Sequence, residues 1–123
     1  TWARLNAQRH KDTYFYYFTY EPLGQPLGAF HAAEISYVFD NVEFSREPNA
    51  ADTRLAQLMS DYWVAFARDG KPAVEGAPRW PRYSPKKPLH LEFTEEGAIR
   101  GRNSLGKRYS TLEKLSASMR QAR

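Results

Sequence analysis

The clearest pattern of hydrophobic and polar positions lies in the middle of the chain. Apolar residues recur there at steps of three and four positions, at Leu55, Leu58, Met59, Tyr62, Trp63 and Phe66. This spacing predicts an amphipathic helix with one broad apolar face. Asp52 or Thr53 can cap its start, and Gly70 followed by Pro72 can end it.

An almost continuous aromatic run occupies residues 13–20, and its residue types favour a β-strand. Because apolar and polar residues do not alternate in it, we expect both of its faces to be covered, as in an interior strand of an α/β sheet. Proline and glycine residues between positions 22 and 28 end the strand and predict a loop. Residues 89–93 do alternate, which predicts a second, short strand with one buried face.

Four further segments carry weaker patterns. Residues 1–8 are typical of the end of a helix, and the apolar spacing over residues 31–39 is compatible with about two helical turns. Residues 97–106 predict a polar turn region. Ser110 and Glu113 have the spacing of a capping box and predict the start of a last helix.

The two predicted strands are not expected to pair with each other in a sheet. Residues 89–93 are short and half polar, so we do not expect them to be the partner of the aromatic strand. A single buried strand cannot form a sheet, and its neighbours are therefore expected outside these 123 residues. The sequence predicts the end of a larger α/β fold that is incomplete as an independent domain.

Composition agrees with a globular protein and excludes several kinds of site. Of the 123 residues, 41% are hydrophobic and 26% charged. The absence of cysteine excludes disulfides, thiolate metal sites and a cysteine nucleophile. No grouping of His, Asp and Glu has metal-ligand spacing, and no apolar run approaches the roughly 18 residues of a membrane span.

The net charge of +4 raises nucleic acid or an anionic surface as a partner. The basic residues are scattered, however, and they occupy different segments from the aromatic ones. A solvated surface explains them more simply, so we expect neither a nucleic-acid nor a membrane partner. The composition does not indicate a compartment.

His31 is the histidine with the most suitable position for chemistry. It follows the aromatic strand in a loop rich in Gly and Ala, and reacting groups of open α/β sheets gather at the carboxyl ends of strands. Taken alone it is more simply a structural loop histidine. His10, in a polar turn, and His90, in a short strand, are expected to be structural or solvated.

Residues 28–39, Gly-Ala-Phe-His-Ala-Ala-Glu-Ile-Ser-Tyr-Val-Phe, resemble the histidine segment of the type-B carboxylesterases, the family that also contains the cholinesterases. That segment has a Gly, two residues, the catalytic His, two residues, Glu-Leu or Glu-Ile, and an aromatic-rich Val-Phe. Residues 14–18 resemble the preceding strand, and residues 61–72 the Tyr-Trp-x-x-Phe-Ala-x-x-Gly-x-Pro helix end. Residues 80–83 resemble the Trp-Pro-x-Tyr that follows. The resemblance spans residues 2–93 and does not extend to the tail.

The resemblance implies the C-terminal part of an α/β-hydrolase, its last strands and packing helices, with residues 1–123 as a segment of one domain. In this fold the triad follows the chain order Ser, acid, His, so His31 would be the general acid/base. No Gly-x-Ser-x-Gly motif occurs here. We therefore expect the serine and the acid on an N-terminal portion of the same enzyme, in a separate or missing chain. The implied substrate is a small carboxylic ester, hydrolysed through an acyl-serine intermediate without cofactor or metal.

Two neighbours of His31 are further candidates. Glu34 stands three residues away, and we expect it to pin the His31 loop by hydrogen bonds to the backbone or a neighbouring side chain rather than to replace the triad acid. A plain surface glutamate is the simpler alternative. Phe30 adjoins His31 and is a candidate for the lining of the acyl or alcohol pocket.

Two other functions remain open at this point. The resembled family also covers adhesion proteins that keep the fold without the chemistry, so a cholinesterase-like binding module is the main alternative. The presence of His31 argues against it, and a missing serine would decide for it. A basic nucleic-acid-binding domain predicts aromatic and basic residues interleaved on one face, which the sequence does not have.

Overall fold

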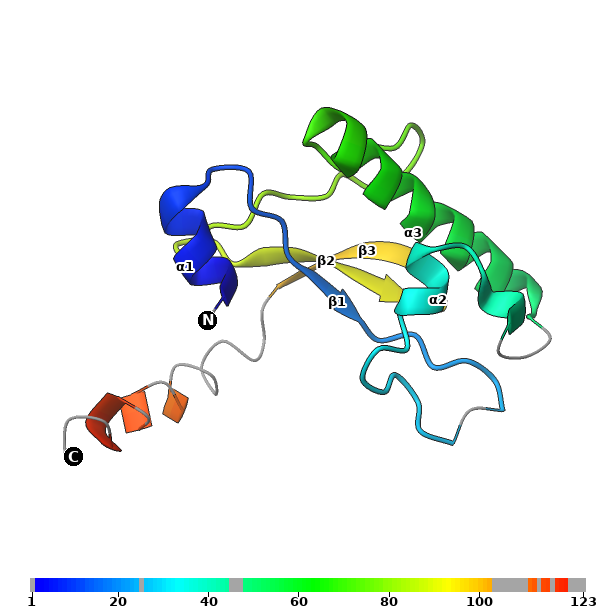
Figure 1. Cartoon of the computed structure of the whole chain (residues 1–123), viewed down its shortest axis with the longest axis horizontal. Helices are drawn as coiled ribbons and strands as arrows, with labels where there is room; N and C mark the ends of the chain where they lie inside the picture. The colour runs from blue at the N-terminus through cyan, green and yellow to red at the C-terminus, as the bar shows by residue number, and fades with distance from the viewer. Residues whose placement is uncertain are drawn as a thin grey trace.

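The computed structural model describes residues 2–24, 26–44 and 48–102, and residues 111–112, 114–115 and 117–119 of the last segment. Its elements are α1 (Trp2–Arg9), β1 (Tyr16–Phe18), α2 (Ile35–Val38), the 3-10 helix η1 (Val42–Phe44), α3 (Ala50–Asp69), β2 (Leu89–Thr94) and β3 (Gly97–Arg102). The strands form one sheet, and α3 lies across one side of it with α2 beside it (Figure 1). This arrangement confirms the α/β class.

The sheet has the strand order β1-β2-β3, with β1 parallel to β2 and β2 antiparallel to β3. Tyr16–Phe18 pair with Leu91–Phe93. The expectation that residues 89–93 could not be the partner of the aromatic strand is therefore wrong. Parallel pairing uses backbone groups, so the polar side chains of β2 do not oppose it, and Leu91 and Phe93 are fully buried.

The prediction of a polar turn over residues 97–106 is also wrong for its first part, because Gly97–Arg102 form β3. The hairpin turns at residues 95 and 96, and Gly97 follows with φ of 108°, a conformation that glycine adopts without strain. The polar residues 95 and 96 followed by Gly97 are a sequence signal for a hairpin turn. The low strand propensity of glycine made the strand after this turn hard to recognise. Residues 103–106 lie outside the described residues.

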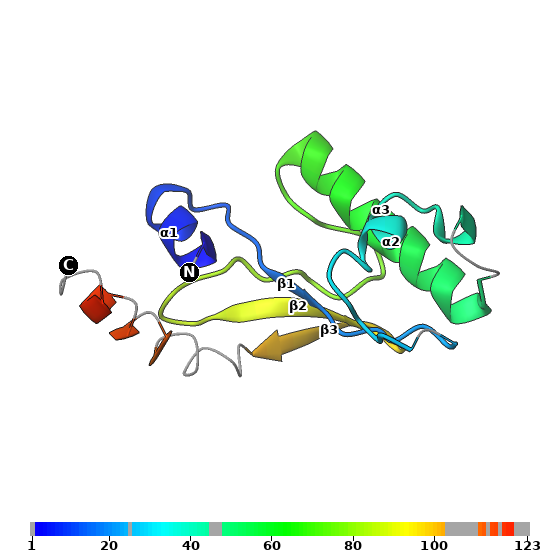
Figure 2. The ribbon, with the colours of Figure 1, turned by 60° about the horizontal axis from the view of Figure 1, so that its bottom comes forward.

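The aromatic run is largely extended backbone whose side chains alternate between the two faces of the sheet. Tyr16 lies on the face covered by α3, where its ring centroid is 5.1 Å from that of Trp63 and 6.1 Å from that of Trp80. Figure 2 shows α2 and α3 together over this face. On the opposite face Tyr17 is 46% exposed and Ile99 43%. Aromatic residues on both faces explain why the run shows no hydrophobic alternation.

Helix α3 has its cap three residues before the nearer of the two predicted caps. Its cap is Asn49 and not Asp52 or Thr53, because Asn49 Oδ1 accepts hydrogen bonds from the backbone N–H groups of Ala51 and Asp52. Asp52 completes a capping box by accepting the N–H of Asn49 at 2.9 Å. The predicted end is confirmed, since Gly70 adopts the left-handed conformation with φ of 68°.

The remaining segments follow the predictions in part. Helix α1 forms as expected and buries none of its residues. The two helical turns expected over residues 31–39 are reduced to turns followed by α2. The described residues of 111–119 are helical, and Ser110 and Glu113, the expected capping pair, lie outside the described residues. Among the helices described, none is both long and apolar enough to cross a membrane.

Candidate functional site

His31 lies in a tight turn that leads into α2. The N–H of Ala33 donates to the carbonyl of Phe30 at 3.1 Å, and the N–H of Ile35 donates to the carbonyl of Ala32 at 3.2 Å. Ala32 has φ of 69°, a left-handed conformation that costs a residue with a side chain about 1–2 kcal/mol. The backbone around His31 is therefore held by hydrogen bonds, and it is strained at Ala32.

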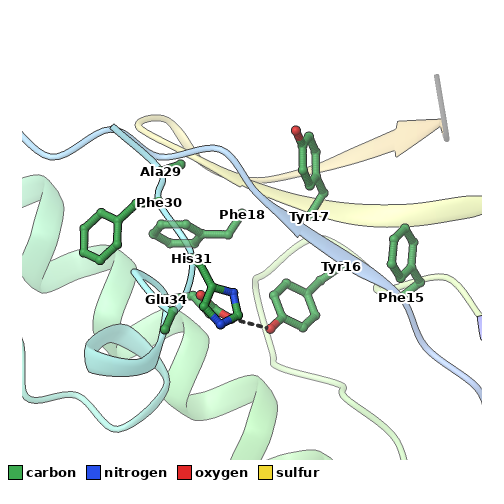
Figure 3. Close-up of a pocket in the computed structure, with 9 residues that line it drawn as sticks. Phe15, Tyr16, Tyr17, Phe18, Ala29, Phe30, His31 and Glu34 are labelled. Carbon is green, nitrogen blue, oxygen red and sulfur yellow. Dashed lines mark hydrogen bonds between the residues drawn. The ribbon is translucent and has the colours of Figure 1, made fainter. Parts of the chain in front are cut away.

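This turn and the strand β1 line an open hollow of about 400 Å³. It is lined by Phe15, Tyr16, Tyr17, Phe18, Ala29, Phe30, His31, Ala32 and Glu34. Figure 3 shows the His31 imidazole, the Glu34 side chain and the Tyr16 ring gathered at this hollow. Its volume lies within the range of small-molecule sites, and His31 is exposed in it.

Glu34 connects the His31 turn to the sheet. Its Oε1 accepts a hydrogen bond of 3.1 Å from the hydroxyl of Tyr16. Glu34 is the N-cap residue of α2, but its side chain makes no capping bond to that helix. Burial, together with the charge and the hydrogen bond of Glu34, raises the pKa of Tyr16 to about 12, so Tyr16 remains a neutral donor.

No hydrogen bond joins His31 to Glu34 within the part of the chain that the structure describes. The Glu34 carboxylate is engaged by Tyr16 instead. A triad acid orients the imidazole through a direct hydrogen bond, so this geometry does not give Glu34 that role. Phe30 is 45% exposed and lies beside His31 in the same hollow.

The other two histidines are outside the hollow. His10 is exposed, and its backbone carbonyl accepts from the hydroxyl of Thr13. His90 is 4% exposed, and the rings of Phe15 and Tyr17 lie beside it at 5.8 and 6.3 Å. Burial lowers the pKa of His90. Among the described residues, no three His, Asp or Glu side chains are grouped to hold a metal ion.

Tyr16 is the residue of the site that sequence reasoning missed. The run of aromatic residues identified a strand but did not show which hydroxyl would reach the His31 turn. Counting every second residue from Tyr14 places Tyr16 and Phe18 on one face, and this was the available signal. The partner, Glu34, is 18 positions away, a separation that no local pattern reports.

Comparison with known proteins places these residues in a family. The chain matches the model of the carboxylesterase family over residues 1–112. The medium-chain fatty acyl-CoA hydrolase precursor of Anas platyrhynchos is 30% identical over 103 residues, which cover 75% of this chain and 18% of that protein. Carboxylesterase 1C of Rattus norvegicus is 35% identical over 80 residues, covering 60% of this chain and 15% of that protein. The chain thus spans less than a fifth of the length of these curated relatives.

The fold has a counterpart among solved structures. A PNB esterase structure superposes with a TM-score of 0.69 at 24% sequence identity, covering 80% of this chain and 21% of the esterase chain. The mixed sheet and its helices therefore have the fold of part of an α/β-hydrolase. Together with the family match over most of its length, this shows that the chain belongs to the carboxylesterase family.

Proposed function

We propose that this chain is part of a serine esterase and supplies its general acid/base, His31. The observation that carries the proposal is the position of His31, exposed in a hollow beside β1 within a segment that resembles the histidine segment of the family. A catalytic imidazole must reach both a serine hydroxyl and the solvent side of a substrate pocket, and this placement permits both.

The proposed reaction is the hydrolysis of a small carboxylic ester. The imidazole takes the proton of a serine hydroxyl while the serine oxygen attacks the ester carbonyl, and it then gives this proton to the leaving alcohol. A water molecule, deprotonated by the same imidazole, next attacks the acyl-serine; the bond to the serine oxygen breaks, the imidazolium returns the proton to that oxygen, and the carboxylic acid is released. The scheme needs no cofactor or metal ion.

The serine and the acid of this scheme are proposed to lie on an N-terminal portion of the same enzyme. The 123 residues hold no Gly-x-Ser-x-Gly motif, and Glu34 is engaged by Tyr16. The half-exposed Tyr17 and Ile99 offer a sheet face on which such a portion can pack. The chain and this portion together are called the complete enzyme below.

Two residues of the hollow have supporting roles in this proposal. Glu34 holds the His31 turn through its hydrogen bond with Tyr16. Phe30 contributes an apolar wall beside the imidazole, where the acyl or alcohol part of an ester would lie. The lining of the hollow and the hydrogen bond between Tyr16 and Glu34 support these proposed roles.

A fluorophosphonate probe tests the proposal, because it labels a serine only where a general base activates it. Intact-mass analysis of the complete enzyme is expected to show one labelled serine on the N-terminal portion. His31→Gln should abolish this labelling, whereas the exposed His10→Gln should leave it unchanged. If the wild-type complete enzyme carries no reactive serine, the adhesion-type binding module replaces the esterase as the better interpretation.

A further inference from the structure

We propose that Tyr16 is a positioning residue for His31 and acts through Glu34. The inference rests on the proposed function, since it assigns a role in placing the imidazole that the esterase reaction requires. Its basis is the hydrogen bond from the Tyr16 hydroxyl to Glu34 Oε1, which joins the sheet to the turn that carries His31.

Tyr16 provides a fixed point for this contact. Its ring packs edge to face against Trp63, Trp80 and Phe93, with centroid distances of 5.1, 6.1 and 6.2 Å. Trp80 is 7% exposed, and Phe93 is fully buried. A ring enclosed by three aromatic neighbours keeps one orientation, so its hydroxyl is presented to the hollow from a rigid part of the core.

Glu34 connects the Tyr16 hydroxyl to the backbone of the turn. Its carbonyl accepts the N–H groups of Tyr37 at 3.1 Å and Val38 at 3.0 Å, so the residue is fixed at the start of α2 as its N-cap. Between it and His31 stand only Ala32 and Ala33, whose methyl groups cannot form hydrogen bonds. Glu34 is therefore the polar side chain within the turn that can tie it to the sheet.

The strained conformation of Ala32 explains why the turn needs a stabilising contact such as the hydrogen bond between Tyr16 and Glu34. A left-handed alanine is unfavourable and persists only where its surroundings hold it. The hydrogen bond from Tyr16 to Glu34, 3.1 Å long, is a side-chain contact that holds this turn against the sheet. Without the tie, the turn can relax toward a common backbone conformation and move the imidazole, and a displacement of about 1 Å costs on the order of 100-fold in rate.

The test measures kcat and KM for ester hydrolysis by the complete enzyme. Tyr16→Phe keeps the packed ring and removes the hydroxyl, and it is expected to lower kcat by about 10- to 100-fold with little change in KM. Glu34→Ala should give the same loss, and the double variant should lose no more than either single one, because both break one bond. Glu34→Gln, which keeps an oxygen acceptor, should recover most of the activity.

Tyr62→Phe is the matched control. Tyr62 is a core tyrosine whose hydroxyl donates to the backbone carbonyl of Pro78, away from the hollow, so its loss should reduce stability and leave kcat unchanged. The inference is overturned if Tyr16→Phe has the same kcat as Tyr62→Phe, or if the losses from Tyr16→Phe and Glu34→Ala multiply in the double variant. Should Tyr16→Phe not fold, equal activities of Glu34→Ala and Glu34→Gln would overturn it. His31→Gln distinguishes a failure of this inference from a failure of the proposed function, because an unchanged rate of ester hydrolysis in that variant would refute the proposed function itself.

Discussion

Gly101 is the position at which a single added methyl group should disturb the sheet most. It stands opposite His90 in the β2–β3 register. A Cβ at Gly101 would lie 2.7 Å from His90 Cε1 and 2.9 Å from Cδ2, and closer still to Nε2. His90 has little room to withdraw, because it is buried and Phe15 and Tyr17 lie beside its ring.

The expected cost combines two opposing effects. Overpacking a filled site typically destabilises a protein by about 1–3 kcal/mol. Replacing Gly by Ala also removes conformational freedom from the unfolded chain, which stabilises by about 0.4–1 kcal/mol where the backbone allows a side chain. The φ of Gly101 is outside the left-handed range, so the backbone does allow one. We therefore expect Gly101→Ala to lower the free energy of unfolding by about 1–2 kcal/mol.

A double-mutant cycle with His90→Ala makes this test specific. Urea unfolding of the complete enzyme gives the free energy of unfolding of the wild type, both single variants and the double variant. In the His90→Ala background the added methyl group has space, so Gly101→Ala should become neutral or slightly stabilising. An equal loss in both backgrounds would refute the reasoning, because the clash with the imidazole would not be its cause.

Three further expectations follow from buried polar groups. Tyr37→Phe should lower the free energy of unfolding by about 1–3 kcal/mol in the same urea assay, because it removes the donor of a 2.8 Å hydrogen bond to the fully buried Asp52. A loss below about 0.5 kcal/mol, the lower end of the range for one hydrogen bond, would contradict this expectation. The pKa values of Tyr16 and Tyr62 are both raised to about 12, so their stabilising contribution is complete below about pH 10 and is lost as the pH rises through 12. The melting temperature should therefore fall between about pH 10 and pH 12, and it should fall less in the variant in which Phe replaces both tyrosines. Burial lowers the pKa of His90, so its contribution to stability is present above about pH 6.5 and is lost as the pH falls through the folded-state pKa. His90→Gln should therefore reduce the fall of the melting temperature on the acid side. An unchanged dependence of melting temperature on pH would argue against this contribution.

The main helix could be predicted from the sequence because its signal is local and repeated. An apolar stripe over α3 and a terminal Gly70 are enough to place its body and its end. The cap was placed at least three residues late, because the capping role of Asn49 depends on the reciprocal hydrogen bond with Asp52 that the structure shows. Local periodicity thus specifies an element well and its N-terminal cap less well.

The sheet could not be predicted in the same way. The pairing of β1 with β2 joins residues about 75 positions apart, such as Tyr16 with Leu91, and no spacing rule reports such a contact. Strand β3 was missed because Gly97 and Gly101 lower its strand propensity, although Gly101 is the residue that accommodates His90. Packing against a particular neighbour overrides propensity at this position.

The candidate site shows the same division. His31, Glu34 and Phe30 lie within five residues, so a short motif could select all three. Tyr16 reaches them from the preceding strand, and only the fold brings its hydroxyl to Glu34. The candidate histidine was thus accessible from the sequence, whereas the contact proposed to position it was not.

The catalytic role of His31 is the central claim, and steady-state hydrolysis of a small carboxylic ester by the complete enzyme tests it most directly. His31→Gln is expected to lower kcat by about 10⁴- to 10⁶-fold, since the loss of a catalytic histidine removes both proton transfers. His10→Gln should retain the wild-type rate. A folded His31→Gln enzyme that hydrolyses the ester as fast as the His10→Gln enzyme would contradict the claim.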